Sequence, residues 1–479
     1  MMTMKKERPS LIYLLVFSLI LTLILTSCGS KKPGRTGSDQ PSKSSSEQAK
    51  APEKAKDNYL LSQPEKKTQP QLPKELGEGA TKEEEEAQNK AYDQYQAFVI
   101  AYQKKAQKVQ YKDAVYEYTG KLNQVLLKDK EKTVLYSPIN TYMAGSMLAE
   151  TAKGDTQKEI LGLLGAENIE KNRTYAKEMR QIVPFDDGRL KITTADSLWL
   201  NKGLEIHDEC IKRLKEIYGA AVYQGPMGEE GYNKALQAWL NENTGNLLKD
   251  QAGEQKFEED NVYALASALY FKGAWDQSFE ENLTKEDIFH GTQGDQTLPF
   301  MHSTESREVF TGNGYDAIAL PFQGGASLWI IRPKEGKTID DLLNNEEVFS
   351  MIKNPMEDEK KEQFQVNLSL PKFDITSDLS LKDSFQSLGI KKAFDSNQAD
   401  FSSLLVNWNQ VYLSGITHAC RLKIDEKGAE AAAFTLMKMD MAALPMNESY
   451  EFKVDQPFLA VLTGMDNTPL VFARVNQLK

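Results

Sequence analysis

The chain has 479 residues and a formal net charge of −11 at neutral pH, and 40% of its residues are hydrophobic. The acidic balance excludes nucleic-acid binding, because contacts with phosphates need a basic face. The hydrophobic fraction suffices for a large core, and the length allows two or three average domains.

The first 27 residues have the pattern of a signal peptide. Lys5, Lys6 and Arg8 precede an apolar run over residues 11–25. This run is shorter than the about 20 residues that a membrane-spanning helix needs. Leu25-Thr26-Ser27-Cys28 resembles the bacterial lipobox, in which the cysteine is lipidated and becomes the mature N-terminus. The resemblance implies lipidation at Cys28, membrane contact through that anchor only, and a location on the cell surface or otherwise outside the cytoplasm.

Residues 28–87 are rich in Ser, Pro, Gln, Lys and Gly. Such a composition cannot bury enough apolar area to offset the loss of conformational entropy on ordering. We therefore expect a disordered, low-complexity tether with an r.m.s. span of about 40–45 Å. A folded domain is expected over residues 88–479.

Helical patterns come first in this domain. Apolar residues recur at spacings of three and four over 91–127, and Gly120 weakens the centre, so one helix or two are expected. Ser137-Pro138 begins another helix that continues through residue 148. A further helix, with apolar positions over 160–164, ends at Gly165.

Strand patterns dominate the second half. The run 262–271 is almost entirely apolar or small, which predicts a central strand buried on both faces. A helix is expected over 379–388. Shorter strands are expected at 191–192, 196–200, 317–321, 327–331, 364–370, 411–413, 419–424, 457–463 and 470–475. Helices followed by strands indicate one large α+β domain.

The segment 426–441 carries two conflicting patterns. Its alanine run favours a helix. Small or apolar residues nevertheless occupy every second position, namely Ala429, Ala431, Ala433, Thr435, Met437, Met439 and Met441. The positions between them hold all the charges of 429–441. A period of two with the charges on one face is typical of a strand with one buried face.

The sequence contains no recognisable catalytic or metal-binding motif. None of the four histidines lies in an HExxH pattern, and there is no GxSxG or P-loop. Cys210 and Cys420 have neither a CxxC partner nor zinc-type spacing, so we expect ordinary thiols and leave their pairing open. We expect no enzyme, no cofactor and no metal.

From about residue 110 to its end the chain resembles the serpin family in an ordered series of motifs. These include Ser137-Pro138-Ile139, Lys153-Gly154-Asp155-Thr156, Leu269-Tyr270-Phe271-Lys272-Gly273-Ala274-Trp275, Leu320-Pro321-Phe322, Leu370-Pro371-Lys372-Phe373, Ala399-Asp400-Phe401-Ser402, Glu426-Lys427-Gly428 with its alanine run, and Phe472-Ala473-Arg474-Val475. Each motif is weak alone, but the ordered set is highly specific. The resemblance implies an α+β fold with three β-sheets, about nine helices and an exposed reactive loop over about 426–450.

The resemblance also implies an inhibitory mechanism. A target serine protease, or a cysteine protease, would cleave the loop and form an acyl-enzyme. It would be trapped when the loop inserts into the central sheet of the monomeric inhibitor. The implied hinge consists of Glu426, Gly428, Ala429, Glu430, Ala431, Ala432, Ala433 and Thr435. Two alternatives stay open: a non-inhibitory serpin that acts as a binding module, and a lipid-anchored solute-binding lipoprotein.

The spacing usual in the family places the scissile bond at Ala442-Ala443, with Met441 and Leu444 as alternative cleavage positions. A small side chain before the cut favours an elastase-like or subtilisin-like protease over a trypsin-like one. Four further residues match the region where the central sheet opens: Ser137, Ser267, His418 and Trp275. The chain departs from the family at Asp196 and Ser267, where asparagine is usual, so the hydrogen-bond network there must differ.

Overall fold

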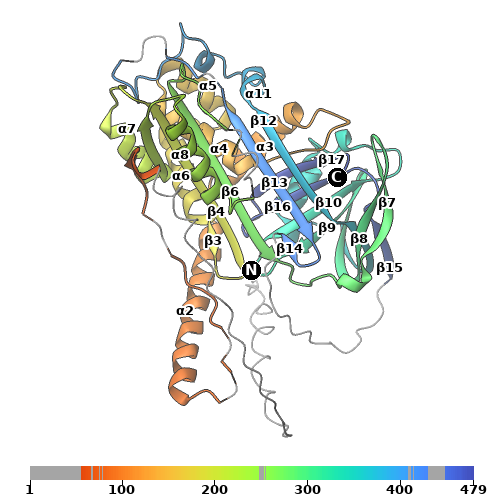
Figure 1. The fold of residues 1–479 in the computed structure, drawn as a ribbon. Coiled ribbons are helices and arrows are strands. Elements are labelled where there is room, and N and C mark those ends of the chain that lie inside the picture. The colour runs from red at the N-terminus through yellow and green to blue at the C-terminus, as the bar shows by residue number, and fades with distance from the viewer. Residues whose placement is uncertain are drawn as a thin grey trace, which may run out of the picture. The chain divides into compact units, whose positions relative to one another are not determined.

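The computed structural model describes residues 56–65, 68–74, 76–77, 79–247, 253, 255–407, 411–413, 415–429 and 448–478. These residues contain nine α-helices and two hydrogen-bonded β-sheets (Figure 1). Cys28, the loop residues Glu430, Ala431, Ala432, Ala433 and Thr435, and the predicted cleavage positions Met441, Ala442, Ala443 and Leu444 lie outside them.

The chain is ordered before the predicted domain boundary at residue 88. Strand β1 (Leu60–Ser62) pairs with β5 (Ala220–Gly225), and helix α2 (Lys82–Ala106) begins with a capping box between Thr81 and Glu84. The ring of Tyr59 packs edge-on against Tyr232, with centroids 4.9 Å apart. For these residues the prediction of a tether is corrected, because a few aromatic and capping side chains fix a segment that is polar on average.

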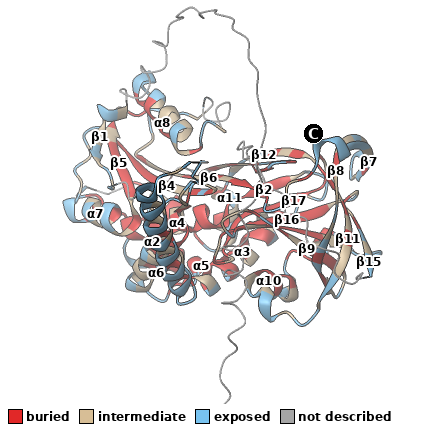
Figure 2. Cartoon of the chain, turned by 90° about the horizontal axis from the view of Figure 1, so that it is seen from below, coloured by how far each residue is buried: buried red, intermediate tan, exposed pale blue. Residues whose placement is uncertain are grey.

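Helix α2 is attached to the body through its second half. Tyr95 donates a hydrogen bond of 2.7 Å to the carboxylate of Asp187, and the hydroxyl of Tyr102 bonds the carbonyl of Ile182. Exposed residues line much of α2, whereas buried residues follow the strands of both sheets (Figure 2). Among the described residues, no helix combines the length and apolar character needed to cross a bilayer.

A layer of helices follows: α3 (Lys112–Leu126), α4 (Pro138–Thr151), α5 (Gly154–Leu164), α6 (Ile169–Ile182), α7 (Asp208–Arg213), which continues in a π-turn over Leu214–Tyr218, and α8 (Glu230–Asn243). The break in the segment 91–127 falls between α2 and α3 and not at Gly120. Gly120 lies inside α3, where the absent side chain leaves room for Phe349, whose ring would lie 3.2 Å from a Cβ.

The first sheet, here called the central sheet, has the strand order β1-β5-β4-β6-β14-β13-β12, with β3 (Phe185–Asp186) paired to β4. The remaining strands are β4 (Leu190–Asn201), β6 (Tyr263–Ala274), β12 (Phe373–Ser380), β13 (Thr417–Asp425) and β14 (Gly428–Ala429). Helix α4 is buried along almost its whole length and packs against β6.

The second sheet has the order β15-β11-β8-β9-β10-β16-β17-β2, with β7 paired to β8. Its strands are β2 (Val134–Tyr136), β7 (Lys285–Gly291), β8 (Gly294–Gly312), β9 (Tyr315–Pro321), β10 (Ser327–Pro333), β11 (Lys361–Pro371), β15 (Ser449–Lys453), β16 (Phe458–Thr463) and β17 (Pro469–Val475). The family resemblance implied three sheets, whereas the described residues form two. The long strand β8 pairs with β7, β9 and β11 and so holds the second sheet together as one. Helices α10 (Glu346–Lys353) and α11 (Lys382–Ser387) complete the fold.

Three predicted elements differ from the structure. Residues 411–413 form no strand, because the N–H of Leu413 bonds the carbonyl of Ala393. The helix predicted over 379–388 is shorter, because Leu379 and Ser380 pair with β13. Strand β6 is only half-buried along much of its length, whereas burial on both faces was predicted. On its side toward β13, β6 pairs only with the two residues of β14, and this short pairing accounts for the difference.

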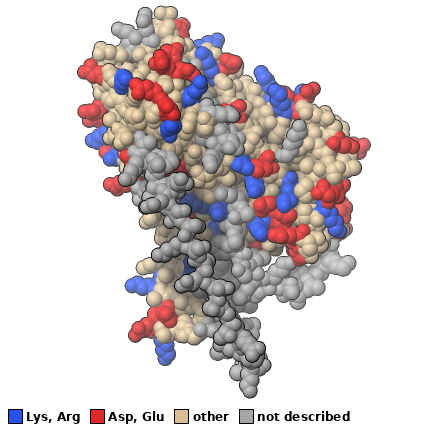
Figure 3. All heavy atoms as spheres, viewed as in Figure 1, with Lys and Arg blue, Asp and Glu red and all other residues tan. Residues whose placement is uncertain are grey.

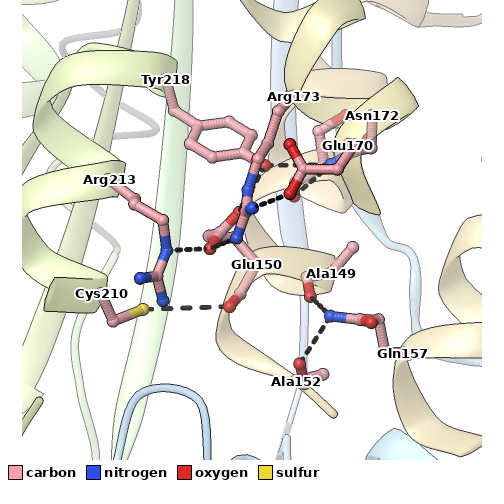
Figure 4. A network of polar contacts seen from close by, with 11 residues as sticks. Ala149, Glu150, Ala152, Gln157, Glu170, Asn172, Arg173, Cys210, Arg213 and Tyr218 are labelled. Atoms are coloured by element: carbon pink, nitrogen blue, oxygen red, sulfur yellow. Dashed lines mark hydrogen bonds and ion pairs between the residues drawn. The ribbon is translucent and has the colours of Figure 1, made fainter. Parts of the chain in front are cut away.

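A buried carboxylate links three of the helices (Figure 4). Glu150 of α4 accepts hydrogen bonds from Arg173 of α6, at 2.7 and 2.8 Å, and from Arg213 of α7. The hydroxyl of Tyr218 adds a bond of 3.0 Å. Burial acts to raise the pKa of Glu150, but the two arginines outweigh it and lower the pKa below its ordinary value. At the surface, basic and acidic side chains are interspersed on the face shown in Figure 3.

Candidate functional site at the seam of the central sheet

Strands β6 and β13 run side by side in the central sheet but are joined only at one end (Figure 1). There β14 pairs antiparallel with both of them. Along the rest of their length, away from β14, no described residue of β6 forms a ladder with β13. We call this line between the two strands the seam. It leaves one edge of β6 without a ladder, which explains why β6 is only half-buried.

Strand β14 is the first part of a strand already placed within the sheet. Ala429 is 3% exposed and lies opposite Gly273 of β6 and Ile424 of β13. Gly428 has φ of +141°, and a Cβ at this position would lie 2.1 Å from the carbonyl oxygen of Gly273. Only glycine allows such a close approach of two backbones. Gly428 therefore directs the chain from the turn into the seam.

Trp275 holds the turn that precedes β14. Its indole is 1% exposed, stacks on Phe322 with centroids 4.3 Å apart, and donates a hydrogen bond of 2.8 Å to the carbonyl of Asp425. The backbone N–H of Trp275 bonds the carbonyl of Lys427 at 3.1 Å. The aromatic residue predicted at the opening of the sheet thus fixes both ends of the turn.

Glu426 of the turn before β14 is anchored by Thr284, just before β7, and by Lys372, between β11 and β12. Its carboxylate accepts a hydrogen bond of 2.8 Å from the hydroxyl of Thr284 and pairs with the ammonium of Lys372, also at 2.8 Å. Partial burial raises the pKa of Glu426, but these partners outweigh it and lower the pKa below its ordinary value. The ion pair ties the turn to Lys372, which lies between β11 and β12.

Replacing Glu426 with glutamine should therefore loosen the hinge. The variant loses the charge on one side of a partly buried pair, which is expected to destabilise the fold by about 1–3 kcal/mol. Urea unfolding monitored by tryptophan fluorescence measures this effect. The matched control is Lys427→Gln, because the Lys427 side chain is exposed and its ion-pair partner Glu281 is exposed as well. Equal losses in the two variants would contradict a special role of Glu426.

Ser137 and His418 meet where α4 abuts the seam. The backbone N–H of Ser137 donates a hydrogen bond of 2.9 Å to Nε2 of His418, and the Ser137 hydroxyl caps α4 through the N–H of Asn140. An acceptor at Nε2 requires a neutral ring with its proton on Nδ1. Burial favours this form, since it lowers the pKa of His418 to about 4.

Two cavities of about 30 Å³ each follow the seam below Ala429. The first is lined by Leu269 and Phe271 of β6, Cys420 and Leu422 of β13, and Ala429 itself. The second is lined by Ser267 of β6 and His418 of β13, together with Asn140 and Thr141 of α4. Small internal voids leave their lining without packing partners on one side. The seam therefore has unfilled space at the level of its polar residues.

The structure brings together some of the predicted residues and separates others. Ser137, His418 and Ser267 gather at the middle of the seam, while Trp275 and Glu426 lie at the end where β14 enters. Sequence reasoning missed Lys372 and Thr284 as partners of Glu426. Lys372 lies in a motif that was recognised, but the 54 residues that separate it from Glu426 carry no pairing signal.

The fold and the seam define a class of protein: a large α+β domain whose central sheet is open along one line. A family model described as "Serpin (serine protease inhibitor)" matches residues 113–478. An alpha-1-antitrypsin-like protein of Ictidomys tridecemlineatus is 28% identical over 357 residues, covering 72% of this chain and 83% of its own length. Human neuroserpin is 25% identical over 371 residues, with 73% and 87% covered.

Solved structures show the same fold. The native thermophilic serpin tengpin has a TM-score of 0.69 at 23% identity, covering 76% of this chain and 93% of its own. The chain belongs to the serpin family, and the predicted serpin fold is confirmed. Members of this family are protease inhibitors in general and not catalytic enzymes. Helix α2 and strand β1 precede the matched region.

Proposed function

We propose that this serpin inhibits serine proteases as a suicide substrate, through cleavage of the loop after Gly428 and its insertion into the seam as a strand between β6 and β13. The observation that carries the proposal is the match between the side chains on the two edges of the seam and the sequence that would enter it. The register of β14 defines this match. Both pairings are antiparallel, so each further loop residue would lie opposite the preceding residue of β6 and of β13.

The inward positions match in size and polarity. Continued in the register of β14, Ala431 lies between Phe271 and Leu422, and Ala433 lies between Leu269 and Cys420. Small side chains thus meet large ones, as dense packing requires. Thr435 would lie between Ser267 and His418, so the one hydroxyl of the inward set would reach the polar centre of the seam.

The outward positions of the loop also match the residues that would flank them, here with a charged and a large side chain. In the same register Glu430 would lie between Lys272 and Lys423, which have no ion pair with any described residue. Phe434 would lie between Ala268 and Ala419, whose small side chains suit a large neighbour. A shift of one residue would place Glu430 in the interior. The alternating pattern of 429–441 thus determines which face of the inserted strand is buried.

The proposal extends to the target and the location. Cleavage at Ala442-Ala443 suits an elastase-like or subtilisin-like protease with a shallow specificity pocket, with Met441 and Leu444 as alternative cleavage positions. Lipidation at Cys28 would hold the monomeric inhibitor at a bacterial cell surface or in another extracytoplasmic compartment. The solute-binding alternative is not supported by the serpin match, which covers residues 113–478.

Incubation of the purified protein with pancreatic elastase and with subtilisin tests the inhibitory function. We expect an SDS-resistant complex with the summed mass of the two proteins, and mass spectrometry of the released peptide should place the cut near Ala442. Protease inactivated at its serine beforehand is the control and should form no complex. Complete cleavage of the loop without a complex would contradict inhibition and support a non-inhibitory serpin.

A further inference from the structure

Asp196 is buried in the middle of the central sheet with an incomplete set of hydrogen bonds. It lies on β4, opposite Ala220 of β5 and Ser267 of β6, and is 6% exposed. Its Oδ1 has no hydrogen-bond partner among the described residues. An ionised carboxylate in such a place is unfavourable unless a cation pairs with it.

Arg180, the cation that acts to lower the pKa of Asp196, does not supply that pairing. Arg180 of α6 lies close enough to act on Asp196, but its guanidinium donates to the backbone carbonyls of Glu216 and Ile217, at 2.8 and 3.3 Å. Burial raises the pKa of Asp196 to about 7, and the opposing effects of the Ser267 hydroxyl and of Arg180 are smaller. The protonated acid is therefore the stable form up to about neutrality.

Other titratable groups on the elements around β4 are engaged elsewhere. Glu150 of α4 is neutralised by Arg173 and Arg213, and Tyr218 of the π-turn bonds Glu150. On β6, Tyr263 is a buried phenol whose pKa is raised by burial, and His418 of β13 is neutral above about pH 4. Among all these groups only Arg180 contributes a charge effect to the pKa of Asp196. Proton binding at Asp196 is thus set by burial.

Ser267 connects this carboxyl group with the seam. It is the residue opposite Asp196 on β6, and it also lines the cavity that His418 lines. Its hydroxyl lies close enough to Asp196 to lower the pKa of that carboxyl group, but it makes no hydrogen bond with any other described residue. An ionised Asp196 is a strong acceptor that draws this hydroxyl toward β4, whereas a protonated Asp196 leaves it free to face the seam.

We propose that Asp196 is a proton-controlled switch of the central sheet. With its proton bound, it packs as a neutral group between β5 and β6 and leaves Ser267 directed at the seam. When the proton leaves, an unpaired charge remains in the interior, so the packing of β4 on β6 weakens and Ser267 turns away from the seam. The sheet is then easier to open at alkaline than at mildly acidic pH.

The direction of the stability change follows from the raised pKa. The folded protein keeps the proton up to about pH 7, whereas the unfolded chain loses it near the ordinary value of 3.8. The stability contributed by the proton is therefore full below pH 3.8, falls as the pH rises toward 7, and is lost above 7. His418, with its lowered pKa, acts in the opposite direction between about pH 4 and 6.5. The contribution of Asp196 is therefore obtained by comparing the pH dependence of unfolding of the wild-type protein with that of a variant without this carboxyl group.

Urea unfolding of the wild-type protein and of Asp196→Asn from pH 6 to pH 8 provides this comparison. We expect the unfolding equilibrium constant of the wild type, divided by that of Asp196→Asn, to rise about tenfold over this range. Asp260→Asn, which changes an exposed aspartate just before β6, is the matched control and should show a constant ratio. A constant ratio for Asp196→Asn as well would overturn the proposal.

A second measurement covers the case that Asp196→Asn does not fold. Infrared spectra of wild-type protein labelled with ¹³C-aspartate should show the C=O stretch of a protonated carboxylic acid at pH 6 and its loss at pH 8. Absence of this band at pH 6 would also overturn the proposal. Neither experiment involves a protease, so both outcomes are independent of the proposed inhibitory function.

Discussion

Replacing Ala433 with arginine is expected to convert the protein from an inhibitor into a substrate. In the register of β14, position 433 enters the seam between Leu269 and Cys420, both on the inner side of the sheet. An unpaired charge buried there costs several kcal/mol. Each 1.4 kcal/mol added to the insertion barrier slows insertion about tenfold, so that release of the protease by hydrolysis takes over. The number of inhibitor molecules consumed per protease molecule inhibited should rise by more than about tenfold.

Two further variants show whether burial of the charge, and not the charge itself, blocks insertion. Ala433→Glu should fail in the same way, because the sign of a buried charge does not matter. Ala432→Glu is the matched control: it lies one residue earlier, would face the outer side of the sheet after insertion and would come beside the guanidinium of Arg421 of β13. Titration of a fixed amount of elastase with each variant gives the stoichiometry of inhibition. A stoichiometry unchanged in Ala433→Arg, or equally raised in Ala432→Glu, would contradict insertion in this register.

Replacing Glu150 with alanine should cause the largest loss of stability among single substitutions considered. The change leaves the guanidinium groups of Arg173 and Arg213 without the buried carboxylate that pairs with both of them (Figure 4). Removing one partner from a buried ion cluster costs about 3–5 kcal/mol. The measurement is urea unfolding at pH 7, and the same loss should appear as a lower thermal midpoint.

Glu170 offers a matched control, because it pairs with the same Arg173 but is exposed to solvent. Glu170→Ala should cost less than about 1 kcal/mol, as is usual for surface pairs. The pH dependence gives an independent check. Because the pKa of Glu150 is lowered, its stabilising effect is present above its ordinary value of 4.5 and is lost as the pH falls through the folded pKa. Similar losses for the two glutamates would contradict a special role of the buried Glu150 in the cluster.

Much of the fold could be predicted because its signals are local. The strands at 317–321, 327–331 and 470–475 are confirmed within a residue or two, since short apolar runs between turns mark them. The cap at Ser137 and the end of α5 at Gly165 are also confirmed, the latter with φ of +65°. Side-chain chemistry at consecutive positions determines such features directly.

Features that depend on distant partners could not be predicted. The seam is visible only when β14 is seen between β6 and β13, and β6 alone has the composition of a fully buried strand. The cluster around Glu150 draws residues from three helices. Strand β1 sits in a polar segment, where two backbone pairs and one aromatic contact decide against disorder. Averages over a window of sequence do not detect such sparse contacts.

Strand β1 also has a consequence for association between molecules. The outer edge of a sheet exposes unpaired N–H and C=O groups, which can recruit a strand from another chain and start a growing polymer. In this protein the N-terminal segment occupies that edge: Leu60 and Ser62 pair with β5, and the carbonyl of Tyr59 accepts the N–H of Gln224 at 2.9 Å. A segment of the same polypeptide therefore acts as a resident cap, and chain-to-chain growth from β5 must first displace it.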